Sequence, residues 1–403
     1  MTEPGETSFT RTAFAAALGA LALAGAISAS YGPLLRPVTH RFGVSLPVAG
    51  TLISINFAGG LAGTLGALAG FTHAPRRPIA TFALGVLGLG CLSIAVSRGW
   101  PTLAIGVFVT GVGFGATDFS LNQSGARSGA GRAVRLTLLN AAFGTGAVLG
   151  PAIVGWLGLR ALTVGFALAA CWAWAMAAGV LGITTAPAAH GDPGGGADRA
   201  RRRSAGRPSG VVVLVALAFL LYVGCEASVA GWIPAHLVAL GYRSRLATAV
   251  TSGFWAAMVV GRLVTVPLSR AVAASRIVLA ACPLLTLALA LTAVPALAPG
   301  CYVAAGFIAA PIWPIGLDWV VATFPGYRSA TSWALTAAFA GGIAGPATVA
   351  GVVSVAGLHA VPAVLAAFAG ATTLAFLAIW RTGRRLLPTS PSTGCGQGAP
   401  GAV

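Results

Sequence analysis

The sequence has little charge and very few acidic residues. Of its 403 residues only 8% are charged, 7 are Asp or Glu, and the 24 basic residues are all arginine, whereas 57% are hydrophobic and the mean hydropathy is +0.88. In ordinary soluble domains about a quarter of the residues are charged. The composition therefore excludes such a domain and predicts an integral membrane protein, which has the lipid bilayer as a partner.

Motifs for metal binding and for covalent chemistry are also missing. The six cysteines form no CxxC pair and the five histidines are scattered. A nucleotide-binding glycine loop and a nucleophile elbow are absent as well. We therefore expect no metal, no cofactor and no enzymatic activity. No basic patch with interleaved aromatic residues accompanies the net charge of +17, so we expect no nucleic-acid binding. Arginines between apolar runs are instead typical of anchors at a membrane surface.

Long uncharged runs lie between the arginines. A helix needs roughly 20 residues to cross a bilayer, and these runs provide twelve spans, because Arg276 to Arg328 and Arg328 to Arg381 are each long enough for two. Pro311 and Pro314 are expected to break the tenth span near the midplane and to free backbone groups that face a cavity. The pattern predicts an all-α membrane protein with twelve transmembrane helices in two six-helix bundles.

A basic stretch rich in Gly and Pro divides the chain into two halves. The predicted parts are a cytoplasmic N-terminus (1–11), a first bundle (12–183), a flexible cytoplasmic linker (184–210), a second bundle (211–381) and a disordered cytoplasmic tail (382–403). With both termini inside, 17 arginines fall in cytoplasmic segments and 6 in outer loops. This excess fits the positive-inside rule. It predicts a multi-pass protein of the cell's inner membrane.

The two halves resemble each other at a shift of roughly 196 to 200 residues, which indicates an internal repeat. SINFAGGLAGTL (54–65) aligns with SGFWAAMVVGRL (252–263), and AAFGTG (141–146) aligns with AAFAGG (337–342). Asp118 falls opposite Asp318. Three pairs of spans thus match in the same order.

Twelve spans, two repeated halves and a central basic linker resemble the major facilitator superfamily, in which two bundles rock about a midplane site and monomers commonly function. ATDFSLN (116–122) followed by LLNAAFGTGAVLGP (138–151) resembles its fucose/proton symporter branch. The resemblance implies that Asp118 is a proton-linked acid and that Asn122 and Asn140 bind the solute. The chain departs from the pattern in two places. Gly70 replaces the aspartate of the superfamily signature, and the first span contains no acid.

Two carboxylates within spans are the candidates for proton coupling. Charges in hydrocarbon are costly, so they usually face a bundle interior or cavity and handle substrate or protons. Asp118 either carries a proton or latches the cytoplasmic end by pairing with Arg127 or Arg132. Glu226 is nearer the middle of its span, and Tyr222 lies one turn before it on the same helix face.

The remaining candidates are polar or aromatic groups within spans. Arg262 and Asp318 are expected to form a gate or packing ion pair, since opposite charges in a membrane usually pair. Tyr31 and Asn56 are expected to line the cavity. Four tryptophans either stack on a solute ring or pack in the core. They are Trp255, Trp313, Trp319 and Trp333.

These residues favour a proton-coupled secondary transporter for a small polar, sugar-like solute. The alternative is a proton-driven efflux pump for a drug or secondary metabolite, in which the carboxylates attract a cationic substrate. A third interpretation, a membrane sensor that binds a ligand without transporting it, would require an appended domain that this sequence does not contain.

Overall fold

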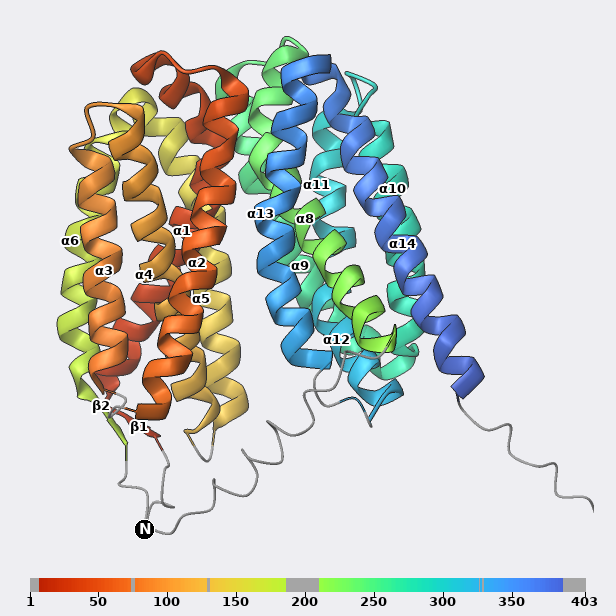
Figure 1. Cartoon of the computed structure of the whole chain (residues 1–403), viewed down its shortest axis with the longest axis horizontal. Helices are drawn as coiled ribbons and strands as arrows, with labels where there is room; N and C mark the ends of the chain where they lie inside the picture. The colour runs from red at the N-terminus through yellow and green to blue at the C-terminus, as the bar shows by residue number, and fades with distance from the viewer. Residues whose placement is uncertain are drawn as a thin grey trace, which may run out of the picture.

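The computed structural model describes residues 7–73, 77–128, 131–185, 210–325, 327 and 330–386, which are almost entirely helical (Figure 1). The helices of the first half are α1 (Arg11–Phe42), α2 (Leu46–His73), α3 (Arg77–Ala95), α4 (Trp100–Ala126), α5 (Arg132–Leu157) and α6 (Val164–Gly179), with the short helical turns η1 (Gly158–Leu162) and η2 (Val180–Gly182). The helices of the second half are α8 (Gly210–Ala239), α9 (Ser244–Ala271), α10 (Ala274–Leu291), α11 (Ala298–Ala309), α12 (Ile312–Thr323), α13 (Ala330–Ala356) and α14 (Val361–Leu386), with the turn η3 (Leu358–Ala360).

The helices supply the predicted number of membrane crossings. Eleven are long and apolar enough to span a bilayer, counting α11 and α12 together, and the shorter apolar helix Ile79–Ala95 adds a twelfth. Large apolar side chains such as Phe82 and Leu168 lie exposed on the outside of the bundles, which fits a surface that faces lipid rather than water. The predicted fold class, twelve transmembrane helices in two bundles, is confirmed.

The tenth span is broken where the two prolines predict a break. α11 ends at Ala309 and α12 begins at Ile312, with Pro311 between them. Proline lacks an N–H, so Pro311 and Pro314 cannot donate to the carbonyls of Phe307 and Ala310, four residues earlier. The break between the helices also leaves the Ala309 carbonyl outside the regular backbone pattern. The Ala309 carbonyl accepts a hydrogen bond of 3.0 Å from the Tyr222 hydroxyl instead.

A two-stranded sheet joins the two ends of the first bundle, and the sequence gives no sign of it. Strand β1 (Thr7–Phe9) pairs antiparallel with β2 (Ile183–Thr185), with Ser8 opposite Thr184. The predicted N-terminal segment and the first residues of the predicted linker therefore form a structured contact. The rest of that linker, residues 186–209, and the tail from residue 387 lie outside the described residues. Helix α14 runs to Leu386, five residues beyond the predicted end of the second bundle.

The same pair of helices packs most closely in each half, as an internal repeat requires. In the first bundle, Gly146 and Gly150 of α5 lie directly against the carbonyl oxygens of Ala22 and Ala26 of α1. In the second bundle α13 packs on α8, with Gly341 and Gly345 against the carbonyls of Leu220 and Gly224. Both contacts use glycines four residues apart, which allows backbones to approach closely.

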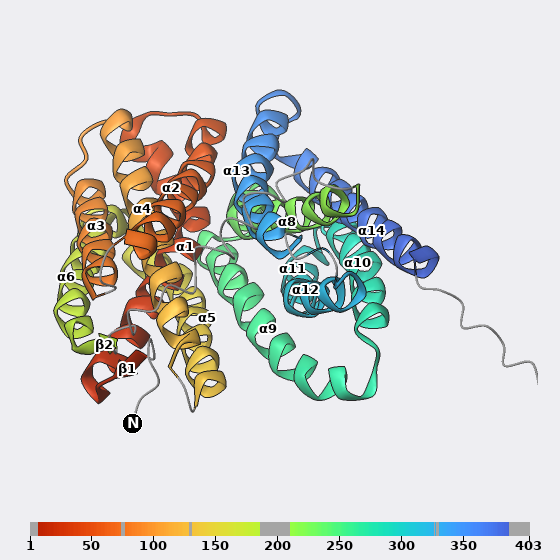
Figure 2. The same cartoon turned by 60° about the horizontal axis from the view of Figure 1, so that its bottom comes forward.

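The two bundles meet mainly along α2 with α13, α5 with α9 and α1 with α8, with a smaller contact of α2 with α8 (Figures 1 and 2). We call the end where β1 lies and α14 finishes the terminal face, and the opposite end the distal face. Near the distal face, Gly32 lies against Ala230 and Gly231, and Gly50 against Trp232. Near mid-height, Gly144 meets Val259 and Gly60 meets Phe339. The cross-bundle contacts at these glycines thus extend from the distal ends to the middles of the helices.

Candidate translocation site

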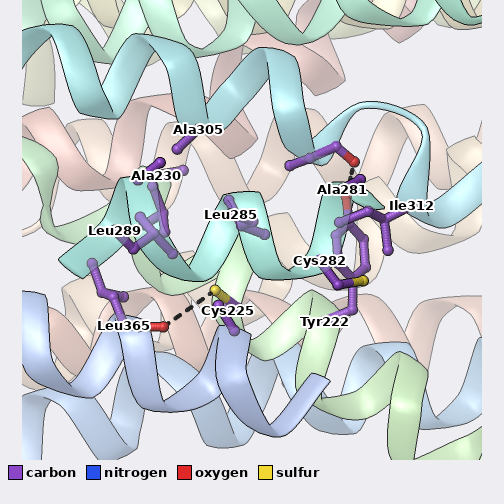
Figure 3. Close-up of a cluster of buried hydrophobic side chains, with 14 of the residues drawn as sticks. Tyr222, Cys225, Ala230, Ala281, Cys282, Leu285, Leu289, Ala305, Ile312 and Leu365 are labelled. Carbon is purple, nitrogen blue, oxygen red and sulfur yellow. Dashed lines mark hydrogen bonds between the residues drawn. The ribbon is translucent and has the colours of Figure 1, made fainter. Parts of the chain in front are cut away.

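Glu226 lies inside the second bundle, beside a small enclosed space. The cavity measures about 10 Å³, roughly what one water molecule needs, and its lining comes from α8, α9, α10 and α11. The lining residues are Tyr222, Cys225, Glu226, Val229, Phe254, Leu285 and Ala309. Figure 3 shows three of these residues, Tyr222, Cys225 and Leu285, within a cluster of buried hydrophobic side chains. The Cys225 thiol lies 3.7 Å from the Leu365 carbonyl oxygen. The predicted Glu226 site therefore lies away from lipid.

Tyr222 connects Glu226 to the broken span. It lies one turn before Glu226 on α8, its side chain is only 1% exposed, and its hydroxyl donates to the Ala309 carbonyl at the break. Glu226 and Arg262 are both within electrostatic range of this hydroxyl. The structure thus gathers an acid, a phenol and a guanidinium from α8 and α9 around the end of α11.

Asp118 is half-buried in α4 and bonds within its own helix. Its Oδ1 atom and its backbone carbonyl each accept a 3.0 Å hydrogen bond from the Asn122 amide. Arg127 and Arg132 are exposed, and no ion pair joins either of them to Asp118 among the described residues. The predicted neighbours Asp118 and Asn122 are therefore brought together, whereas the latch is not formed in this conformation.

The direction of the Asp118 side chain follows from its neighbours on α4. Phe114, one turn toward the distal face, contacts Phe143 of α5 with ring centroids 6.2 Å apart. Gly111, two turns toward the distal face, packs on Asn56 and Gly59 of α2. At roughly 100° per residue, Asp118 falls between these two directions. Its side chain thus points between α2 and α5, both of which contact the other bundle.

Asn140 is exposed on the face of α5 that is turned toward the second bundle. It lies one turn before Gly144, and Gly144 contacts Val259 of α9. The Asn140 amide donates to the Leu136 carbonyl at 2.8 Å. Arg262 lies nearly one turn beyond Val259 toward the terminal face. Asn140 and Arg262 therefore occupy similar levels on facing helices.

Tyr31 and Asn56 are also brought together, but inside the first bundle. The Asn56 amide donates to the Tyr31 hydroxyl at 3.0 Å and lies 3.5 Å from the Val107 carbonyl oxygen. Both side chains are buried. The pair joins α1, α2 and α4, and in this conformation it presents no surface to a solute.

The tryptophans have different surroundings. Trp313 packs edge-on against Phe219, with ring centroids 5.0 Å apart, and Trp319 stacks on Phe376 at 6.2 Å. Trp255 packs edge-on against Phe254, and its indole N–H is buried without a hydrogen-bond partner. Trp333 is 47% exposed. Core packing accounts for Trp319, whereas the indole N–H of Trp255 has no hydrogen-bond acceptor among the described residues.

Arg262 and Asp318 form no ion pair in this conformation. Asp318 is exposed on α12. Arg262 instead donates from Nη2 to the Met258 sulfur at 3.6 Å, and its Nε atom is buried without a partner. The gate pair stays a prediction for another conformation.

Two groups were missed by sequence reasoning. Ser252 has a buried hydroxyl without a partner and lies on the same face of α9 as Trp255 and Arg262. Ser252, Trp255 and Arg262 lie at i, i+3 and i+10, a spacing that places them on one face of a helix and that is visible in the sequence. Trp232 was also missed. It is fully buried where α8 meets Gly50 of α2, and nothing in its local sequence indicates that contact.

The fold and the in-span charges define an all-helical membrane transporter rather than an enzyme. The profile of the Major Facilitator Superfamily matches residues 17–300. The chain belongs to this superfamily. No curated protein matches the chain.

Solved transporters share the fold at low sequence identity. A D-xylose-proton symporter superposes with a TM-score of 0.73 at 14% identity, covering 93% of this chain and 98% of its own. A nucleoside transporter gives 0.73 at 12%, covering 92% and 100%. A peptide transporter gives 0.71 at 13%, covering 93% and 94%. At these identities the likeness extends to the fold alone.

Proposed function

We propose that this chain is a proton-coupled secondary transporter that moves a small polar, sugar-like solute across the inner membrane by alternating access. It would act as a monomer with the terminal face in the cytoplasm. The observation that carries the proposal is Glu226, a carboxylate at mid-span beside an enclosed cavity and near Tyr222 and Arg262. An acid in such a place is costly to keep, and in membrane proteins it usually belongs to a substrate or proton path.

The roles follow from the surroundings of each side chain. Glu226 takes up and releases the coupling proton, and Asp118, bonded to Asn122, is the second coupling acid. Asn140 and Trp255 contact the solute from facing helices, and Trp313 closes the site against Phe219. Tyr31 and Asn56 hold the first bundle together during the movement.

The names of the structural neighbours do not identify the solute that this chain transports. They refer to xylose with protons, to nucleosides and to peptides. One fold thus carries chemically different solutes, because the cargo depends on the side chains grafted on it. The cargo of this chain has to be argued from its own residues.

Transport by purified protein in proteoliposomes with an imposed pH gradient tests the coupling. Glu226→Gln and Asp118→Asn should each abolish gradient-driven accumulation of a labelled solute, while exchange of solute without a gradient persists. Asp192→Asn, an acid in the predicted linker, serves as the matched control and should accumulate solute normally. Gradient-driven accumulation that is unchanged in both span variants would remove these acids from the coupling role.

The same vesicles separate uptake from efflux. A symporter accumulates solute on the side toward which protons flow, whereas a proton-driven efflux pump moves solute against the proton flow. The efflux alternative is therefore supported only if the labelled solute accumulates on the side from which protons flow, and if it changes sides when the pH gradient is reversed.

The gate pair has its own test. We propose that Arg262 and Asp318 pair when side chains rearrange as the terminal halves close. Exchanging the two residues (Arg262→Asp with Asp318→Arg) should then restore part of the transport that Arg262→Gln or Asp318→Asn loses. A double variant no better than the single ones rejects the pair.

A further inference from the structure

One face of α9 carries a row of three hydrogen-bond donors, Ser252, Trp255 and Arg262, together with Thr248 and Val259. Five positions, 248, 252, 255, 259 and 262, fall within an arc of roughly 80° on the helix. Thr248 and Val259 mark the direction of this arc, because they contact Gly155 and Gly144 of α5 in the other bundle. Helix α9 lies beside α5 of the first bundle (Figure 2). By helical spacing, Ser252, Trp255 and Arg262 fall on the face of α9 that carries these two contacts.

Ser252, Trp255 and Arg262 each keep a donor without an acceptor in the part of the chain that the structure describes, whereas the neighbouring Thr248 hydroxyl donates to the Ser244 carbonyl at 2.9 Å. Ser252 Oγ, Trp255 Nε1 and Arg262 Nε are buried and without a hydrogen-bond partner among the described residues. The hydrogen bond that Arg262 does make is with the Met258 sulfur, a weak acceptor. Tryptophan and arginine donate only. Buried polar groups in native proteins are nearly always satisfied, and an exception requires an explanation.

The two helices that pack together here do not supply a negative charge to the donor row. Neither α5 nor α9 contains an Asp or a Glu. Arg262 forms no ion pair with Asp318 or with Glu226 among the described residues. Arg262 is partly buried and makes no ion pair within the described part of the chain, and its buried Nε donor lacks an acceptor that a bound anion would supply. Its planar, forked donors suit a carboxylate or a phosphate group.

Space for a solute lies at the distal end of the same row. A groove of about 370 Å³ lies between α5 and α9 and is open at the surface, where Trp156 and Arg245 are exposed. Its volume is within the size range of small-molecule sites. Its lining residues are Ala152, Gly155, Trp156, Arg245, Thr248, Ala249 and Ser252. Ser252 belongs to both the groove and the donor row, and the groove adds a second cation, Arg245. The row therefore runs from one arginine to another over roughly 25 Å of helix.

We infer that the cargo of this protein carries an oxyanion, a carboxylate or a phosphate, which the donor row of α9 binds with Arg262 as its charged partner. Trp255 donates to the same group, and Asn140 faces the site from α5. The inference rests on the proposed function in one respect, that the bound molecule is the cargo. It also makes a cationic efflux substrate the wrong charge for this interface.

Ligand-dependent thermal stabilisation of the purified protein measures binding without transport. The probes are pairs that differ in the oxyanion: D-glucuronate with D-glucose, glucose 6-phosphate with D-glucose, and benzoate with benzamide. At least one oxyanion should raise the melting temperature at a concentration on the order of tenfold lower than its neutral partner does. The carboxylate and phosphate arms show which oxyanion is preferred. Oxyanions that act no better than their neutral partners in all three pairs overturn the inference.

Variants test whether the donor row of α9 causes the preference for the oxyanion. Arg262→Gln should abolish the preference for the oxyanion, Arg262→Lys should keep part of it, and Trp255→Phe, which retains the ring and removes the N–H, should weaken binding several-fold. Arg270→Gln changes an exposed arginine near the end of the same helix and should change nothing. A preference that persists in folded Arg262→Gln overturns the assignment. Binding without any transport contradicts the proposed function instead, so the two failures are distinct.

Discussion

At the scale of single residues, the second bundle depends on a hydrogen bond between a side chain and a broken helix. The Tyr222 hydroxyl donates to the Ala309 carbonyl, which the break before Pro311 leaves without a helical donor. Tyr222 is 1% exposed, so bulk water does not reach this bond. The same residue lies beside Glu226 and Arg262. Its hydroxyl therefore fixes the backbone at the place where the ionisable groups gather.

Tyr222→Phe should lower the free energy of unfolding by about 1 to 3 kcal/mol, because a buried carbonyl loses its donor. Tyr242→Phe is the matched control. It removes a hydroxyl that donates to the Pro295 carbonyl at 2.8 Å in an exposed position, where water can take its place. Thermal unfolding in detergent measures both variants. Equal losses in the two would show that the Tyr222 bond adds nothing specific to the break.

Individual site residues were predictable to different degrees. Glu226 with Tyr222 and Asp118 with Asn122 follow from helical spacing, since residues four apart share a face. The contact between Tyr31 and Asn56 joins different helices, and the sequence marks both residues only as polar groups in spans. The surroundings of Arg262 were not predictable, because opposite charges suggested Asp318 and the structure leaves Asp318 exposed.

At the scale of helices, glycine decides which faces approach. On α5, a side chain at Gly146 would overlap the carbonyl oxygen of Ala22. On α13, a side chain at Gly351 would meet nothing within 4 Å. Both glycines lie inside long helices and look alike in the sequence. Only the partner helix distinguishes a packing glycine from one that faces open space.

Gly146→Ala should therefore destabilise the protein by about 1 to 3 kcal/mol through overpacking. Gly351→Ala should stabilise it by up to about 1 kcal/mol, because alanine is the better helix former. Thermal unfolding of the two variants side by side gives the sign of each effect. The packing account fails if Gly146→Ala is as stable as the original protein.

The helices themselves were largely predictable because charge is so scarce. Each run between arginines became one span or, in the two longest runs, two spans. The proline pair of the tenth span became the boundary between α11 and α12. The pairing of β1 with β2 was not predictable. It consists of three residues on each side, separated by the whole first bundle, and neither segment has a strong strand pattern.

At the scale of the whole molecule, the repeat found in the sequence corresponds to matched packing. The glycine contacts of α5 with α1 recur in α13 with α8. Such a pseudo-symmetric pair of bundles can move as two bodies. The relative position of those bodies was not in the sequence, since it depends on contacts such as Gly50 with Trp232 and Gly144 with Val259.

The central claim is that the two bundles rock about these mid-height contacts, so that opening one face closes the other. Spin-label distances test it directly in lipid nanodiscs, after replacement of the native cysteines. One label pair, at Ser45 and Ser244, spans the distal face, and a second, at Ala133 and Ser269, spans the terminal face; all four positions are exposed. Acidification and added solute should lengthen the distal distance and shorten the terminal one together. Distances that stay fixed, or that change in the same direction at both faces while the protein transports, would contradict the account.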